Sequence, residues 1–310
     1  MTQQCTDSVF LVRPAAFGFN AETAATNRLQ RAGTWPHAQV QQQALAEFDA
    51  MVAALRSEGV QVCVVDDTPM PPKPDAVFPN NWVSWHADGT VVLYPMQAAN
   101  RRAERRDEIV TTVARATGFT VTRVLDLTAH ERDGRFLEGT GSLVLDRVAR
   151  VAYACRSPRT DERVLAEWCG AMGYGAEVFD AFDRDGVPFY HTNVLMGIGR
   201  RFAAIGAGCV ARADRDRVLA RLSAGGRTVI NLDRGEVEAF AGNLLELASW
   251  DEALGDTSVL ALSAAARAAL APDRYAELAA CVDVVLPIPV PTIERLGGGS
   301  VRCMLAEVFR

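Results

Sequence analysis

The chain of 310 residues is poor in several features that would mark common functional classes. Its net charge is −6, so it lacks the basic surface that binding to nucleic acid phosphates requires. No apolar run approaches the ~18 residues of a membrane helix. The first residues, MTQQCTDSVF, lack the basic and then apolar pattern of a secretory signal. We therefore expect a cytoplasmic protein that acts on a small molecule and binds neither nucleic acid nor membrane. It is a possible homo-oligomer.

Motifs for metals and for organic cofactors are also missing. The seven cysteines are scattered, with neither a CxxC pair nor a Cys/His cluster at zinc-ligand spacing. The sequence has neither a GxxxxGK[ST] phosphate loop nor a GxGxxG fingerprint. We expect no metal and no cofactor. Six thiols are interpreted as small apolar side chains in a reducing compartment: Cys5, Cys63, Cys155, Cys169, Cys209 and Cys281.

What the chain does contain is a repeat of strand, helix, glycine and strand. In the first unit VFLVRP (9–14) precedes a helical pattern at Leu45, Phe48, Val52 and Leu55, which ends at Gly59 before the strand VQVCVV. Four more units follow, with helices near 109–113, 164–172, 218–222 and 275–281. Each later unit has an extra leading strand, as in WVSW, which an Asp-Gly turn joins to TVVLYP.

The first unit lacks a leading strand, whereas the final segment SVRCMLAEVF (300–309) is predicted as a strand with no strand after it. If this segment pairs with VFLVRP, the ring closes and no open sheet edge remains there. The predicted fold is therefore α/β: a single domain of residues 1–310 with five ββαβ units arranged as a pseudo-symmetric propeller.

Polar residues and glycines recur where the leading strands begin. They are Asn80-Asn81, Glu138 to Ser142, His191 to Asn193, Gly242-Asn243 and Gly297 to Cys303. In a ring these positions meet at one end of the axis, and converging polar groups in a concave site are the usual sign of an active site. We expect Arg101-Arg102 and Arg105-Arg106 on a solvated helix face, and His37, His86 and His130 at the surface.

Three of these residues suit nucleophilic catalysis. Cys303 follows three glycines, where backbone can approach a ligand, and strand alternation would turn Arg302 to the opposite face. His191 titrates near neutral pH and can move protons in both directions. Glu138 beside that imidazole would orient it and raise its pKa. Asn20, in the polar stretch 14–40, belongs either to a surface loop or to a lid over the site.

These residues resemble the motifs of the guanidine-modifying superfamily with the pentein fold, which includes arginine deiminases, dimethylarginine hydrolases, succinylarginine dihydrolases and amidinotransferases. FPNN (78–81), LEGTGS (137–142), YHTN (190–193) and GGGSVRC (297–303) occupy the motif positions over nearly the whole chain. The nearest resemblance is to bacterial amidinotransferase-like proteins, some described as citrulline-utilisation hydrolases. It implies Cys303 as nucleophile, His191 as general acid and base, and Glu138 as its partner or a substrate ligand. Substrate-binding positions would be Phe78, Asn80, Asn81, Asn193, Asn243 and Asn20.

One departure from the superfamily pattern concerns charge. Enzymes of the superfamily that bind a cation usually have carboxylates where this chain has Asn80-Asn81 and Asn193. Because an uncompensated buried ion is costly, the amides favour a neutral ureido group over a guanidinium. Asp75 and Glu138 could still supply negative charge, so a guanidino substrate stays open.

The predicted activity is hydrolysis of a C–N bond in a citrulline-like or arginine-like compound through a covalent Cys303 adduct. An amidinotransferase would form the same adduct and pass it to an amine. A third alternative is a non-catalytic binding protein on the same fold.

Overall fold

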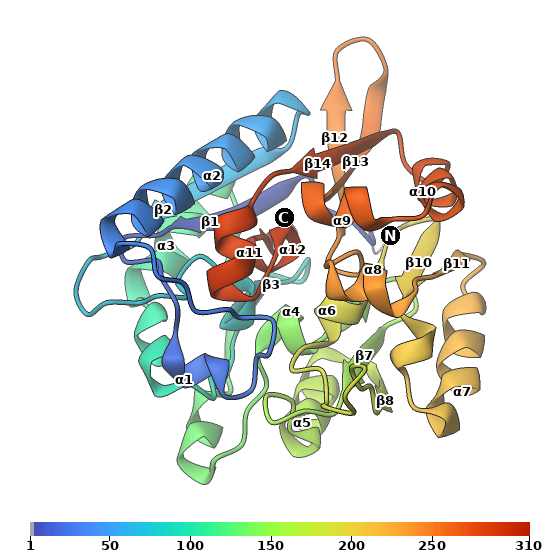
Figure 1. The fold of residues 1–310 in the computed structure, drawn as a ribbon, viewed down its shortest axis with the longest axis horizontal. Coiled ribbons are helices and arrows are strands. Elements are labelled where there is room, and N and C mark those ends of the chain that lie inside the picture. The colour runs from blue at the N-terminus through green and yellow to red at the C-terminus, as the bar shows by residue number, and fades with distance from the viewer. Residues whose placement is uncertain (1–2) are drawn as a thin grey trace.

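The computed structural model describes residues 3–310 as five small sheets arranged around a central axis (Figure 1). In each sheet the middle strand pairs antiparallel with the leading strand and parallel with the third strand. This is the predicted ββαβ propeller, which is confirmed. The sheets are β15 (Ala306–Glu307), β1 (Ser8–Arg13) and β2 (Gln61–Asp66); β3 (Val83–Trp85), β4 (Thr90–Leu93) and β5 (Arg123–Asp126); β6 (Val144–Asp146), β7 (Val151–Cys155) and β8 (Gly175–Phe179); β9 (Met196–Ile198), β10 (Phe202–Ile205) and β11 (Thr228–Asn231); and β12 (Leu245–Asp251), β13 (Gly255–Ser263) and β14 (Val284–Ile288).

The two ends of the described chain close the ring. β15 lies antiparallel to β1, with Val9 opposite Glu307 and Phe10 opposite Ala306. Val308 then forms a bridge to Trp85 of the next sheet. The C-terminal strand thus completes the first unit, as predicted from the missing leading strand.

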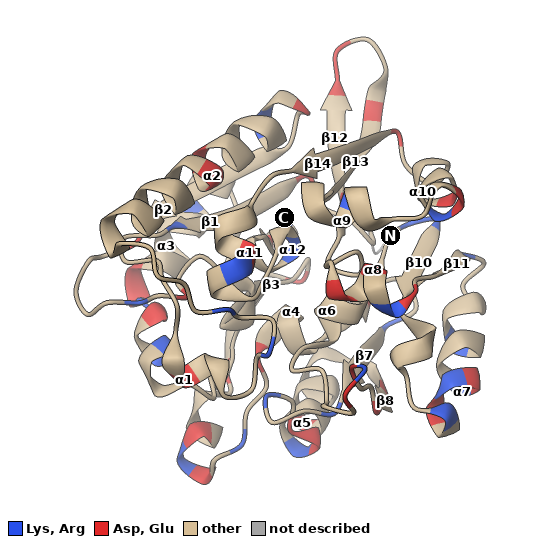
Figure 2. Ribbon diagram, in the orientation of Figure 1, with Lys and Arg blue, Asp and Glu red and all other residues tan. Residues whose placement is uncertain are grey.

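Helices connect the middle and third strands, because a parallel pair needs a crossover. These are α2 (His37–Ser57), α3 (Asp107–Thr117), α5 (Glu162–Met172), α7 (Arg212–Ser223), and the pair α9 (Ala264–Ala269) and α10 (Pro272–Ala279). Charged residues of both signs lie on these outer helices, for example on α5 and α7 (Figure 2). Within residues 3–310, every helix is too short or too polar to cross a membrane.

The core is filled with aromatic and aliphatic side chains between neighbouring units. Trp85 packs edge-on against Phe10, with ring centroids 5.2 Å apart. His86, expected at the surface, is buried, and its Nε2 lies 2.8 Å from the Ser84 hydroxyl. Burial lowers its pKa to about 3, so His86 is a neutral member of the core.

The predicted leading strands begin later than expected. Where the sequence suggested strand starts, the chain forms single helical turns: η1 (Pro79–Asn81), α4 (Gly139–Ser142), α6 (Thr192–Leu195) and α12 (Val301–Met304). The prediction of one strand over 300–309 was therefore wrong. These residues are buried on all sides, so their apolar pattern lacked the periodicity that separates a strand from a helical turn.

The remaining short helices lie in the connections. They are α1 (Ala21–Ala24), η2 (Ala99–Glu104), η3 (Thr128–Asp133), η4 (Ala207–Cys209), α8 (Arg234–Glu238) and α11 (Pro291–Gly297).

Candidate active site

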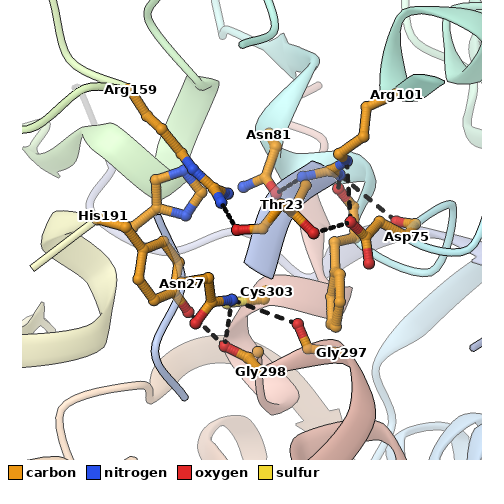
Figure 3. A pocket seen from close by; sticks show the side chains of 13 residues that line it. Thr23, Asn27, Asp75, Asn81, Arg101, Arg159, His191, Gly297, Gly298 and Cys303 are labelled. Atoms are coloured by element: carbon orange, nitrogen blue, oxygen red, sulfur yellow. Dashed lines mark hydrogen bonds and ion pairs between the residues drawn. The ribbon is translucent and has the colours of Figure 1, made fainter. Parts of the chain in front are cut away.

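A cavity opens where the helical turns meet at one end of the axis (Figure 3). Its empty space, which includes space open to solvent, is about 260 Å³. Figure 3 shows Asp75 and Arg101 on one side, His191 and Arg159 on the other, and Cys303 between them near the glycines. The cavity is lined by Thr23, Asn27, Asp75, Phe78, Asn81, Arg101, Arg159, Tyr190, His191, Gly297, Gly298, Gly299 and Cys303.

Cys303 lies on the turn α12, and its thiol is held by two asparagines. Asn243 Nδ2 lies 3.2 Å from Cys303 Sγ, and Asn193 Oδ1 lies 3.8 Å from it. Asn243 Oδ1 accepts the Arg302 backbone N–H at 3.1 Å, so its NH2 group is the one that faces the sulfur. Burial raises the pKa of the Cys303 thiol, while the Ser300 backbone, Asn243 and Arg302 act in the opposite direction. Asn193 and Asn243 therefore contact the thiol and do not line the cavity.

His191 and Glu138 form a buried pair beside the cavity. His191 Nε2 lies 2.8 Å from Glu138 Oε2, and Glu138 Oε1 accepts the Gln97 backbone N–H at 3.0 Å. Burial alone would raise the pKa of Glu138, but Arg159 and His191 outweigh it and hold that pKa below its usual value. An ionised carboxylate has no proton, so His191 Nε2 carries the hydrogen and Nδ1 keeps a free lone pair.

The pKa of His191 differs from the sequence-based expectation. Glu138 does raise it, but burial has the larger effect and lowers it to about 4. The imidazole is therefore neutral at neutral pH and is ready to accept a proton.

Glycines in two motifs allow close packing around these groups. A Cβ at Gly141 would lie 2.5 Å from Asn81 Nδ2 and 2.8 Å from His191 Nδ1. A Cβ at Gly297 would lie 2.8 Å from the Phe78 ring. The glycines that suggested room for a ligand thus let protein side chains approach the backbone closely.

Asn81 lines the cavity, and Asn80 lies behind it. Arg101 Nη1 donates to Asn81 Oδ1 at 2.8 Å, and Asn81 Nδ2 donates to Asn80 Oδ1 at 3.0 Å. Since a guanidinium has only donors, this contact fixes which end of the Asn81 amide is oxygen. Asn80 Nδ2 is buried with no partner.

Arg101 was expected on a solvated face, but it is 2% exposed and lines the cavity. It contacts Glu104 twice, at 2.8 and 2.9 Å, and its Nε lies 3.8 Å from Asp75 Oδ2. Burial raises the pKa of Asp75, against the effect of Arg101, and Asp75 Oδ1 has no partner. Sequence reasoning missed Arg101 because an RRAERR segment is typical of a solvated helix face.

Arg159 was also missed, since nothing near it in the sequence sets it apart. Its guanidinium donates to the Thr23 carbonyl at 2.9 Å and to Thr26 Oγ1 at 2.8 Å, and its Nη1 lies 3.4 Å from Glu138 Oε2. Asn20 does not line the cavity. It caps α1 and donates to Asp75 Oδ2 at 2.7 Å, so it supports that carboxylate.

Segment 14–40 crosses the cavity and contributes Thr23 and Asn27 to its lining. Asn27 Nδ2 donates to the Gly298 carbonyl at 3.1 Å, which ties the segment to the glycine loop. Within residues 3–310, no group of three or more His, Cys, Asp and Glu side chains is arranged to hold a metal ion. Of the six thiols expected to be structural, five are buried and Cys63 is half-buried.

A family model described as "N,N dimethylarginine dimethylhydrolase, eukaryotic" matches residues 13–310. The chain belongs to this family. It is a member of the guanidine-modifying superfamily with the pentein fold and a hydrolase that acts on C–N bonds. No curated protein sequence matches the chain.

Solved structures show how widely this family's fold is shared. The N-terminal domain of an ArgZ variant, covalently bound to a reaction intermediate, has a TM-score of 0.74 at 16% identity, with 97% of each chain covered. Full-length ArgZ, an arginine dihydrolase from the ornithine–ammonia cycle in cyanobacteria, has a TM-score of 0.74 at 15% identity; the alignment covers 97% of this chain and 40% of that one. A dimethylarginine dimethylaminohydrolase adduct with 4-chloro-2-hydroxymethylpyridine has a TM-score of 0.65 at 15% identity, covering 99% of this chain and 100% of that one. At these identities, the likeness shows the fold alone.

Proposed function

We propose that this family member hydrolyses a C–N bond in a small ureido or guanidino amino-acid derivative, with a citrulline-like substrate favoured over an arginine-like one. The reaction proceeds through a covalent adduct with Cys303. The observation that carries the proposal is one cavity that brings together a thiol, Cys303, and an imidazole, His191, whose other nitrogen is bound by Glu138. A nucleophile, a base and a group that orients the base are the parts that nucleophilic catalysis needs.

The chemistry runs in two steps. The Cys303 proton passes to His191 Nδ1, and the thiolate attacks the sp2 carbon of the substrate. The imidazolium then protonates the departing nitrogen as the C–N bond breaks, which leaves a carbamoyl or amidino group on sulfur. Neutral His191 next takes a proton from water, the hydroxide displaces Cys303 from that carbon, and the thiol regains its proton.

The polarity of the Asn81 amide supports a ureido group. Its oxygen already accepts from Arg101 and one of its two N–H groups donates to Asn80, so the amide has a second N–H left for another acceptor. A urea carbonyl accepts such donors, whereas a guanidinium has no acceptor.

The charge of the lining points the same way. Asp75 is the one carboxylate among the lining residues of the described chain, and burial raises its pKa. A buried guanidinium would have to rely on this group. The free Oδ1 of Asp75 and the family's dimethylarginine-hydrolysing name keep a guanidino substrate as the alternative.

Arg159 suits the carboxylate of an amino-acid substrate. It lines the cavity, and two of its contacts are to neutral oxygens, so its charge is only partly matched by Glu138. Arg101 is less available because Glu104 holds it through two contacts.

The test is ammonia release from citrulline, arginine, agmatine and N-succinylarginine and dimethylamine release from dimethylarginine, with Cys303→Ala as control. Faster turnover of citrulline than of arginine, lost in Cys303→Ala, supports the proposal. Much faster turnover of arginine refutes the ureido preference, and full activity of Cys303→Ala refutes the mechanism. A need for added amine would indicate an amidinotransferase.

A further inference from the structure

A second cavity lies inside the ring, with about 350 Å³ of empty space that includes space open to solvent. Residues of β6, β9 and β12 line it, together with residues next to or within α12 and β15. Because these are leading strands, the cavity lies on the axis. The charged groups that line it are Arg147, Arg302 and Glu307.

These three side chains form one buried cluster, which we call the axial cluster. Arg302 Nη2 donates to Glu307 Oε2 at 3.1 Å, and Arg147 Nη2 lies 3.5 Å from the same oxygen. The Arg147 guanidinium also lies over the Phe309 ring, 3.8 Å from its centroid. Each of the three charged residues is at most 9% exposed. Two cations share one carboxylate, so the axial cluster carries one positive charge in excess.

The axial cluster lies directly behind the nucleophile. The turn α12 places Arg302 at the axial cavity and Cys303 at the substrate cavity. Asn243 contacts both residues, through the Arg302 N–H and the Cys303 sulfur. A thiolate on Cys303 would supply the negative charge that balances the excess positive charge of the axial cluster, so no ion from solvent is needed.

We infer that Arg147, Arg302 and Glu307 are positioning residues for the nucleophile and that their excess charge stabilises the Cys303 thiolate from the side opposite the substrate. This inference rests on the proposed function only in taking Cys303 as the nucleophile.

Before His191 accepts the Cys303 proton, the substrate side supplies little of that charge. Its charged and titratable groups facing Cys303 are Asp75, Glu138, Arg101, Arg159, His191 and Tyr190. Arg101 is paired with Glu104 and Arg159 in part with Glu138, and with the further negative charge of Asp75 when ionised these groups carry no net positive charge. His191 is neutral at neutral pH. A neutral ureido substrate would bring no cation either, so until His191 is protonated the charge that favours the thiolate comes from the axial side.

The pKa of Arg302 is lowered, as expected where too few negative charges surround a buried arginine. Burial lowers its pKa, while Glu307 and a Cys303 thiolate would raise it. Formation of the thiolate and retention of the Arg302 charge therefore favour one another.

The experiment measures the rate of Cys303 alkylation by iodoacetamide against pH in the intact protein. Trypsin cleaves after Arg302 and releases CMLAEVFR (303–310), in which Cys303 is the one cysteine, so mass spectrometry separates it from the other six. Arg147→Met should raise the apparent pKa of Cys303 by on the order of one pH unit, and Glu307→Gln should lower it by a similar amount. Arg147→Lys keeps the charge and should restore the original value.

A matched control is Arg227→Met, which removes an arginine whose largely covered side chain pairs one to one with Asp146. This variant should leave the Cys303 pKa unchanged. Shifts of the same sign in Arg147→Met and Glu307→Gln, or no shift in either, would overturn the inference, because loss of structure cannot move the pKa in opposite directions. If Glu307→Gln does not fold, the difference between Arg147→Met and Arg147→Lys still decides. Failure of the proposed function is a separate result, namely turnover by Cys303→Ala.

Discussion

Replacing Asn81 by Asp is the sharpest test of why amides surround this site. The change keeps the size of the side chain and turns a neutral group into a carboxylate. Arg101 Nη1, now 2.8 Å from Asn81 Oδ1, would continue to donate to it. The neighbouring Asn80 can adapt, because its buried Nδ2 has no partner and would donate to the new carboxylate if the Asn80 amide turned over. We therefore expect Asn81→Asp to fold.

The variant should shift preference from ureido to guanidino substrates. It removes the N–H that we assign to the urea carbonyl and adds an acceptor that a guanidinium can use. A hydrogen bond to a charged group contributes about 1.5–3 kcal/mol, which corresponds to about 10- to 100-fold in the ratio of kcat/KM for arginine over citrulline. The assay is kcat/KM for both substrates in Asn81→Asp and in the wild-type protein.

Asn80→Asp is the matched control, because Asn80 lies behind the cavity and does not line it. An unchanged substrate ratio in Asn81→Asp, or an equal change in Asn80→Asp, would show that the polarity of the Asn81 amide does not select the substrate.

Contacts around the cavity make three further outcomes testable. Gly141→Ala should lower kcat at least about tenfold with the fold intact, because the new Cβ would displace Asn81 or the His191 ring; wild-type kcat in a folded variant would contradict this packing. Arg159→Met should reduce the advantage of arginine over agmatine, which lacks the carboxylate, and an unchanged KM ratio would place that carboxylate elsewhere. Glu138 has a pKa held below its usual value, so it stabilises the fold above the unfolded pKa of about 4.3, and this stability is lost as pH falls through the lower folded pKa. Urea unfolding of Glu138→Gln should therefore depend less on pH below about pH 4 than unfolding of the wild-type protein, and parallel curves would refute the assignment.

The fold was largely predictable because its signals are local. Alternating strands, helical spacing and glycine ends recur five times, and each is set by residues within one unit. Even the closing pair of β1 and β15 followed from counting strands, since the first unit lacks a leading strand and the final strand is left over to fill that place.

The helical turn at α12 was not predictable in the same way. Val301 to Met304 are buried on every side, so no alternation between a wet face and a dry face marks their conformation. Strand alternation was expected to turn Arg302 away from Cys303. Arg302 does face away from the substrate cavity and lines the axial one, but a helical turn places it there.

The sequence by itself determined the five units, the closure of the ring and the meeting of Cys303, His191 and Glu138 at one end of the axis. Only the tertiary structure decided which groups control them: Arg101 at Asn81, Arg159 at Glu138, Asn243 at the thiol, and the axial cluster behind it. The reason is physical. Secondary structure depends on neighbours in the chain, whereas the charge and protonation of a buried group depend on whatever folding brings within a few ångströms of it.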